Sequence, residues 1–443
     1  MEETREVRIV PSPLLIWLVA GVGFPAAIAA AMFPAGRMAA IAAGCAVAIA
    51  AFVDAAWRGR ALAGIGIETP DLVRVFKDRA AEIAVRIHNP DRAARRLRIG
   101  IAAPDGLEIS EEERLIQLPA SEVAAFSWSW TGRRRGRYRI EACYLEAASP
   151  LGLWTVRRRD AIALEIRVYP NLRGKDDLKA LRRGAAGVHS LRQIGRGREF
   201  EKLREYVAGD GFDEIHWKAA ARRGRPITKV FQVERTQEIY VIVDASRLSA
   251  RRVGEETAVE RAISAALLIG AAAERSGDLF GLAAFATQVE AFTRARNGKA
   301  HYAACRDAIY QIQPRLAPPD FDEIATFLRL RLRRRALLIF LTSLDDTVIS
   351  ENFARAMRLL SRRHLVVAAM ARPEWAKPLF QDPAVESPRD VYRQLAGHLG
   401  WKKLRETETA LSRIGIRLVL LDPQHFGSGL IGLYDEVKQR QLL

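Results

Sequence analysis

The first 60 residues carry two long stretches of apolar side chains. Residues 14–33 contain no charged side chain, and a second stretch covers residues 38–57 if Asp54 is tolerated near its end. Each stretch is about 20 residues long, enough to cross a hydrocarbon core of roughly 30 Å as a helix. The short link at residues 34–37 requires antiparallel helices, so we expect a membrane hairpin whose two ends lie on the same side.

Positive charges gather at the open end of this expected hairpin. The open end carries Arg5, Arg8, Arg58 and Arg60, whereas the tip carries only Arg37. The positive-inside rule then predicts two spans in the inner membrane, with both termini and the soluble domains in the cytoplasm. A cleaved signal peptide and a buried core hairpin are the alternatives. The second apolar stretch, directly after the first, argues against a signal peptide.

Between residues 61 and 170 apolar and polar side chains alternate with a period of two. The alternation is clear at residues 83–87 and 164–168, and turn sequences such as Asn-Pro-Asp at 89–91 separate the runs. Short alternating runs at this spacing predict a small β-sandwich. Trp128 and Trp130 share one face of such a run, and we expect them in its core rather than on a binding surface.

Residues 171–235 form a basic connector with little strand periodicity. This segment holds 16 Lys and Arg against 9 Asp and Glu, a large share of the +17 carried by the whole chain. A basic excess invites a nucleic-acid interpretation. Because the excess is concentrated in this connector rather than in a groove-reading helix or a tail, and the hairpin tethers the connector near the membrane, we expect contact with anionic lipid headgroups and no nucleic acid.

From about residue 236 to residue 443, buried strands alternate with helices. We expect strands at 239–243, 280–285, 336–341, 364–370 and 416–421, and helices at 256–275, 299–312, 322–333, 351–361 and 391–414. This alternation predicts a doubly wound α/β domain with a mostly parallel sheet. Ligands of such folds bind at the carboxyl ends of the strands, so the loops after Val243 and Leu341 are the places to look for chemistry.

Oxygen-bearing side chains occupy both of these loops. Asp244, Ser246 and Ser249 follow the first strand, and Asp345 belongs to the loop that begins at Leu341. Hard oxygen donors of this kind suit Mg²⁺ or Ca²⁺. The alternative is that Asp244 orders its own loop and binds no ion.

The Asp-x-Ser loop resembles the metal-ion-dependent adhesion site of von Willebrand factor A domains. A segment upstream is similar to the signature of the bacterial domain-of-unknown-function family 58; it comprises residues 195–200, Leu203, Arg204, Glu205, Tyr206, Gly209, Asp210, Ile215, Trp217, Lys218, Ala221 and Arg222. Family members also share the hairpin, the A-type domain and a β-domain that ends in a sequence like residues 149–154. The resemblance therefore covers nearly the whole chain.

This resemblance implies a membrane-tethered protein that is not itself an enzyme. Family members are commonly encoded beside MoxR-type AAA+ ATPases and transglutaminase-like membrane proteins. It thus implies an adaptor or scaffold that engages such an ATPase through its A-type domain, in envelope maintenance or protein maturation.

Several positions depart from the family patterns. Leu248 stands where the adhesion site has its second Ser, Ser343 stands where an Asp is usual, and residues 319–322 supply no Thr. Asp213 and His216 replace an Arg and an Asp of the upstream signature. Loss of ligands weakens an ion site sharply, so the sequence predicts at most a degenerate metal site.

The upstream signature permits two interpretations. Its candidate residues are Arg204, Tyr206, Asp210, His216, Trp217, Lys218 and Arg222. They could form a polar patch that contacts a partner. We favour the second interpretation, in which they form ion pairs that hold the connector in place, with Tyr206 and Trp217 buried, because buried charges are usually paired.

Other chemistries find less support in the sequence. A hydrolase that uses Asp210, His216 and a neighbouring Ser is the alternative function, although no nucleophile and base stand out as a pair. The seven His lack zinc-ligand spacing, and no glycine-rich phosphate loop is complete, so we expect no nucleotide. Three Cys in separate regions predict no disulfide.

Overall fold

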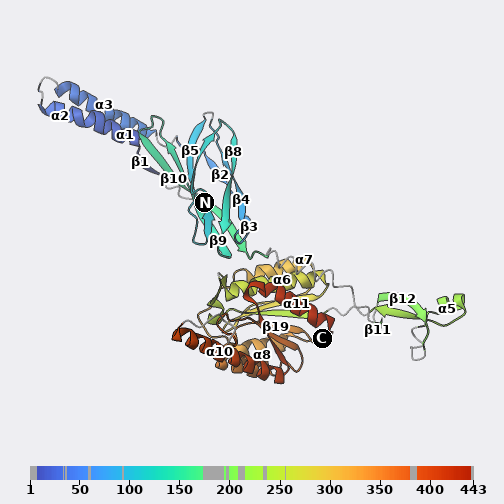
Figure 1. Ribbon diagram of the computed structural model, residues 1–443. Coiled ribbons are helices and arrows are strands. Elements are labelled where there is room, and N and C mark those ends of the chain that lie inside the picture. Colours follow the sequence, from blue (N-terminus) through green and yellow to red (C-terminus); the bar gives the residue numbers. More distant parts are fainter. Residues whose placement is uncertain are drawn as a thin grey trace. The chain divides into compact units, whose positions relative to one another are not determined.

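The computed structural model describes residues 7–32, 34, 37–57, 61–91, 94–172, 194–195, 199–207, 215–232, 237–254, 256–379 and 387–440. The chain divides into two compact units, Met1–Asn171 and Leu172–Leu443. Figure 1 shows their elements, and each unit is described by itself.

The first unit contains two helices long and apolar enough to cross a membrane. One runs over Pro13–Met32 as α1 (Pro13–Leu18), a π-helical turn (Val19–Gly23) and α2 (Phe24–Met32). The other is α3 (Arg37–Ala56), which lies beside α2 (Figure 1). Their mean hydropathies are 2.2 and 2.0. Side chains such as Trp17 and Phe52 are about three-quarters exposed, an apolar surface that water would not favour.

Two β-sheets form the rest of this unit. The first has the order β1-β10-β9-β5-β7, with β3 also paired to β10; the second has the order β2-β4-β8-β6. The strands are β1 (Val7–Pro11), β2 (Gly66–Glu68), β3 (Leu72–Phe76), β4 (Ala80–His88), β5 (Arg95–Gly100), β6 (Leu107–Ile109), β7 (Glu113–Leu118), β8 (Val123–Gly132), β9 (Gly136–Ala148) and β10 (Trp154–Tyr169). Side chains from both sheets share one hydrophobic core, in which Trp128 and Trp130 are 1% exposed. Their expected core position is confirmed.

A buried carboxylate joins α3 to the turn before β10. Asp54 is 0% exposed and accepts hydrogen bonds from Ser149 Oγ (2.5 Å), Leu151 N (2.9 Å) and Leu153 N (3.0 Å). The indole Nε1 of Trp154 also donates to the carbonyl of Ala51 in α3 (2.8 Å). From the sequence, Asp54 is only a charge at the end of a span, whereas in the structure it is the acceptor that orders residues 149–153.

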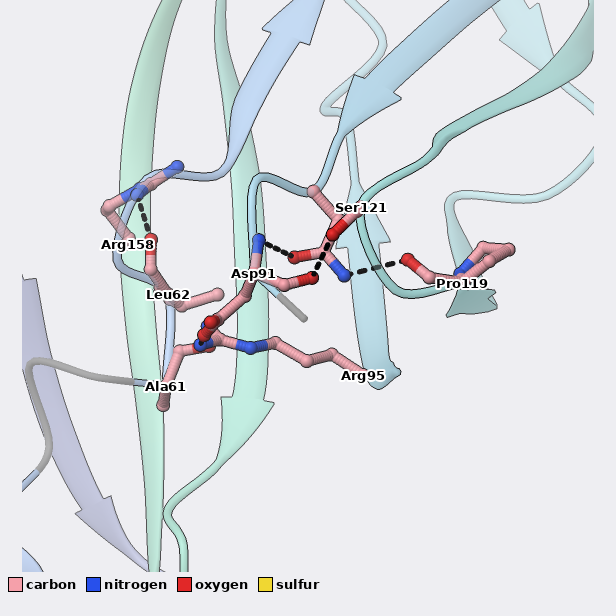
Figure 2. Close-up of polar contacts among 8 residues, drawn as sticks. Ala61, Leu62, Asp91, Arg95, Pro119, Ser121 and Arg158 are labelled. Carbon is pink, nitrogen blue, oxygen red and sulfur yellow. Dashed lines mark hydrogen bonds and ion pairs between the residues drawn. The ribbon is translucent and has the colours of Figure 1, made fainter. Parts of the chain in front are cut away.

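Two arginines hold the segment that follows α3 (Figure 2). Arg95 Nη1 donates to the carbonyl of Ala61 (2.7 Å), and Arg158 Nη1 donates to the carbonyl of Leu62 (2.6 Å). Arg158 is 4% exposed and is paired with Asp160 at 2.6 Å, which satisfies its buried charge. Hydrogen bonds therefore fix the first residues after the helical hairpin onto the β-sheets.

The second unit begins with a small antiparallel sheet in the basic connector. Its order is β11-β13-β12, with β11 (Ile194–Gly195), β12 (Glu199–Glu205) and β13 (Ile227–Gln232); a short helix, α5 (Trp217–Arg223), precedes β13. Little strand periodicity marks this segment of the sequence. Within β12 a register shift lies between Phe200 and Lys202, and such a bulge interrupts the period-two pattern of that strand.

A six-stranded sheet, in the order β18-β17-β14-β19-β20-β21, is the centre of the α/β part. The strands are β14 (Glu238–Asp244), β17 (Leu279–Phe285), β18 (Val289–Arg296), β19 (Leu337–Leu341), β20 (Leu365–Ala371) and β21 (Ile416–Leu421). Parallel pairs join β14 to β17 and β19, β19 to β20, and β20 to β21, whereas β18 runs antiparallel to β17. The carboxyl ends of β14, β19 and β20 therefore meet at one edge.

Helices cover both faces of this sheet (Figure 1). One core contains residues of α6 (Ala258–Arg275), α7 (Lys299–Ile309) and α11 (Phe426–Gln439); the other contains residues of α8 (Phe321–Arg331), α9 (Thr347–Met357) and α10 (Pro388–Arg413). Burial on both faces explains the near-continuous apolar runs by which the strands were predicted. The sequence analysis did not predict β18 or α11.

Candidate functional site

Asp244 lies at the end of β14, where it is 2% exposed. Its Oδ1 accepts a hydrogen bond from the backbone N of Ser246 at 2.8 Å, and its Oδ2 accepts one from Thr342 Oγ1 at 2.5 Å. Thr342 directly follows β19, the parallel neighbour of β14, so the sheet itself brings the two side chains together. Thr342 was not among the predicted site residues, although the loop after Leu341 was expected to supply oxygen at this edge.

The surroundings of Asp244 change its acidity. Burial raises the pKa of its carboxyl group, and the hydrogen bonds from Ser246 and Thr342 oppose that rise without cancelling it. The carboxyl group therefore keeps its proton to a higher pH than an exposed aspartate does.

The two predicted serines, Ser246 and Ser249, form hydrogen bonds within their own loop rather than at the open edge of the sheet. Ser246 Oγ accepts a hydrogen bond from Leu248 N (3.3 Å) and caps the 3-10 turn Arg247–Ala250. Ser249 Oγ donates to the carbonyl of Ser246 at 2.7 Å. Both hydroxyl groups thus have partners inside their own loop, as local side-chain to backbone bonds usually do.

Asp345, the fourth predicted metal ligand, already forms an ion pair with an arginine. Its Oδ2 accepts a hydrogen bond from Arg251 Nη1 at 2.7 Å, and its Oδ1 is buried with no hydrogen-bond partner among the described residues. No group of three or more His, Cys, Asp or Glu in the described part of the chain could hold a metal ion. These residues therefore do not fit a divalent cation, which needs several free oxygen ligands. The predicted Mg²⁺ or Ca²⁺ stays a prediction.

A cavity of about 270 Å³ opens at this edge of the sheet. Its polar lining comprises Asp244, Ser249, Arg251, Arg252, Arg261, Thr342, Ser343, Asp345, Arg372 and Glu374, and Trp375 and Phe426 add aromatic surface. These residues come from the loops after β14, β19 and β20 and from the first turns of α6 and α11. Sequence reasoning missed the loop after β20 and Arg261, because neither carries a recognisable motif.

The connector residues are only partly placed by the structure. His216 Nδ1 accepts a hydrogen bond from Ala219 N at 3.0 Å and so caps α5. Trp217 is 69% exposed, so the expectation that it is buried was wrong, and Tyr206 is half-buried. Lys218 and Arg222 are exposed on α5, and Arg204 is half-buried on β12. Asp210 lies outside the described residues.

Comparison with solved structures finds 107 matching chains, among them the following three. WR4, a C. elegans MSP family member, is 8% identical, with 24% of this chain and 96% of that chain covered and a TM-score of 0.16. A protein of unknown function from Porphyromonas gingivalis W83 is 12% identical, with 33% and 60% covered and a TM-score of 0.19. The CARDB domain of PF1109 from Pyrococcus furiosus is 17% identical, with 24% and 91% covered and a TM-score of 0.15. TM-scores this low support no functional argument.

Comparison with curated proteins finds no match. The sequence profile of the family described as "Protein of unknown function DUF58" matches residues 202–379, from β12 through the strands β14, β17, β19 and β20. This stretch includes the cavity residues of the loops after β14, β19 and β20. The match supports the DUF58 family for this chain.

Proposed function

We propose that this protein is a membrane-anchored adaptor or scaffold whose α/β part binds a partner protein at the carboxyl edge of its sheet. The cavity at that edge carries the proposal. It gathers arginine, aspartate and glutamate side chains from loops that follow three neighbouring strands. The lining places the Thr342 hydroxyl against the Asp244 carboxylate, but this pair is buried, at 7% and 2% exposed, and joins two strand ends, so recognition explains the lining better than catalysis does.

The helical hairpin supplies the anchor in this proposal. The helices Pro13–Met32 and Arg37–Ala56 would cross the inner membrane, and the basic residues near their open end would keep the rest of the chain in the cytoplasm. Lipid would then cover exposed apolar side chains such as Trp17 and Phe52.

The α/β part would act as a von Willebrand factor A-like domain. Its Asp-x-Ser loop after β14 and its parallel strand pairs support this interpretation. The family resemblance points to a MoxR-type AAA+ ATPase as the partner, in envelope maintenance or protein maturation. The connector hydrolase is less well supported, because His216 Nδ1 is already occupied as the cap of α5.

Recovery of the ATPase from detergent extracts tests the proposal. The full-length chain is used as bait with ATP and with ADP, beside the charge reversals Arg252→Glu, at the cavity, and Arg247→Glu, outside its lining. We expect the wild type and Arg247→Glu to recover a MoxR-type ATPase, and Arg252→Glu to recover much less. Recovery of no ATPase with either nucleotide would count against the adaptor function.

A further inference from the structure

We infer that the cavity at the carboxyl edge of the α/β sheet binds a carboxylate of an acidic peptide segment, with the guanidinium of Arg261 as its main contact. This inference names the chemical group that the proposed partner contact recognises. It rests on the proposed function only for the identity of the protein that supplies the peptide. It also assigns the edge to an anion, whereas the sequence predicted a metal cation there.

Arg261 is a half-buried cation without a matching anion. Its Nη2 donates to the carbonyl of Val253 at 2.6 Å, but its Nη1 is buried and has no hydrogen-bond partner among the described residues. Glu256, Glu374 and Asp422 attract the guanidinium from a distance, yet no described carboxylate forms an ion pair with it. Native proteins rarely leave a buried donor unsatisfied, and Arg261 lines the cavity, so a ligand there supplies the missing acceptor after a small shift of the side chain.

The surroundings of Arg261 favour an anion. Arg252 and Arg372 are exposed at the same cavity, and Arg261 lies in the first turn of the 18-residue helix α6, whose amino end carries partial positive charge. The lining holds four arginines, Arg251, Arg252, Arg261 and Arg372, against three acidic residues; of these, Asp345 is paired with Arg251, and Glu374 is exposed at the rim. Asp244 is 2% exposed, and its oxygens already accept hydrogen bonds from Ser246 N and Thr342 Oγ1. An incoming carboxylate therefore meets an excess of positive charge.

One acceptor in the cavity lining also lacks a hydrogen-bond donor, and this second unpaired atom favours a peptide as the ligand. Asp345 Oδ1 is buried and accepts no hydrogen bond from a described residue. A peptide with an acidic side chain brings both groups at once, a carboxylate for Arg261 and a backbone N–H for Asp345. The volume of about 270 Å³ lies just below the roughly 300 Å³ at which small-molecule pockets begin, and suits one or two side chains.

Binding of a model peptide tests the inference without any ATPase. The probe is a fluorescent peptide of alternating Gly and Glu, compared with its Gly and Gln counterpart and with inorganic phosphate, on the full-length chain in detergent. The test variant is Arg261→Gln, which keeps an amide donor for the Val253 carbonyl and removes the charge. Arg247→Gln is the matched control, because Arg247 is exposed at the same edge but does not line the cavity.

We expect the Glu peptide to bind more tightly than the Gln peptide, and Arg261→Gln to weaken it about tenfold or more, the usual loss for a charged hydrogen-bond donor. Arg247→Gln should leave binding unchanged. Should Arg261→Gln not fold, Arg372→Gln at the exposed rim should weaken binding about threefold, the size typical of an exposed charge pair.

Three results would overturn the inference: equal binding of the Glu and Gln peptides, no binding of either, or binding of phosphate without the Glu peptide. The assay contains no ATPase, so a failed ATPase recovery leaves its outcome unchanged. The two proposals can therefore fail separately.

Discussion

Asp54 and Asp244 are both buried carboxylates, but the two units of the chain surround them differently. Asp54 accepts three hydrogen bonds, all from the turn at residues 149–153. Asp244 accepts one bond from its own loop and one from Thr342 on the neighbouring strand, and it lines a cavity. A carboxylate enclosed by one turn orders that turn, whereas a carboxylate at the meeting point of two strand ends helps to shape a binding surface.

The difference shows why burial alone is a poor guide to function. Both residues are nearly inaccessible, at 0% and 2% exposed. Backbone N–H groups supply two of the three donors to Asp54, so this acid fixes α3 to the β-sheets. The region around Asp244 differs because it lines a cavity, and two residues of that lining, Arg261 and Asp345, each have a buried polar atom without a partner among the described residues. Beside a cavity, a ligand can supply such a partner.

Replacement of Asp54 should give the largest effect. Asp54→Ala leaves the buried N–H groups of Leu151 and Leu153 without an acceptor, which costs roughly 1–3 kcal/mol for each group. We expect a clear fall in the unfolding temperature of the first unit, followed by the fluorescence of the buried Trp128 and Trp130. Asp105→Ala, at an exposed turn of the same unit, is the control. Equal stability of both variants would mean that Asp54 does not order the turn.

Replacement of Thr342 should have a smaller effect, limited to the sheet edge. Thr342→Val keeps the shape of the side chain but removes the donor to Asp244 Oδ2, which should cost about 1–2 kcal/mol. Hydrogen exchange of β14 and β19 should become faster in this variant. Thr347→Val, at the exposed start of α9, should leave exchange in these strands as it is. Equally fast exchange in the control would mean that the hydrogen bond from Thr342 to Asp244 does not stabilise these strands.

The pH dependence of stability tests the surroundings of Asp244. Burial raises the pKa of Asp244 above its ordinary 3.8, so the folded state holds this proton more tightly than the unfolded state does. The resulting stabilisation of the folded state is fully present below pH 3.8. It is lost as the pH rises through the folded-state pKa, by at most about 1.4 kcal/mol per pH unit. Asp244→Asn carries no such proton, so its stability relative to the wild type should increase as the pH rises from about 4. Parallel pH profiles of the α/β part would contradict the raised pKa.

Addition of metal ions should give the smallest effect. Titration calorimetry of the full-length chain with Mg²⁺, Ca²⁺ or Mn²⁺ should show no heat that Asp244→Ala removes, because Asp244, Ser249 and Asp345 Oδ2 already have partners, and Asp345 Oδ1 alone supplies too few ligands. A binding heat that depends on Asp244 would restore the predicted metal site and would make the carboxylate inference unnecessary.

The strands of the α/β part could be predicted because burial on both faces leaves continuous apolar runs. β21 lies at the predicted residues, and β14 extends one residue beyond each end of its predicted run. β18 was missed because it is an edge strand with charged residues at Glu290, Arg294 and Arg296. β1 was missed because its five residues directly precede the first apolar helix.

The candidate site could be predicted only as a location. The rule that ligands bind at the carboxyl ends of strands led to Asp244 and the loop after Leu341. It could not show that Thr342, rather than a metal ion, contacts the carboxylate, because that depends on side-chain direction. Arg261 follows β14 by 17 positions and enters the cavity only because α6 begins at the same edge.

Site-specific photocrosslinking tests the central claim, that this sheet edge binds a partner protein, most directly. A photoreactive residue replaces the exposed Glu374, which lines the cavity, or the exposed Glu323 of α8, which does not. Membranes of the native host are irradiated, and the crosslinked products are identified by mass spectrometry. The account predicts a MoxR-type AAA+ ATPase crosslinked from position 374 and little from position 323. Equal yields at both positions, or no ATPase at either, would contradict it.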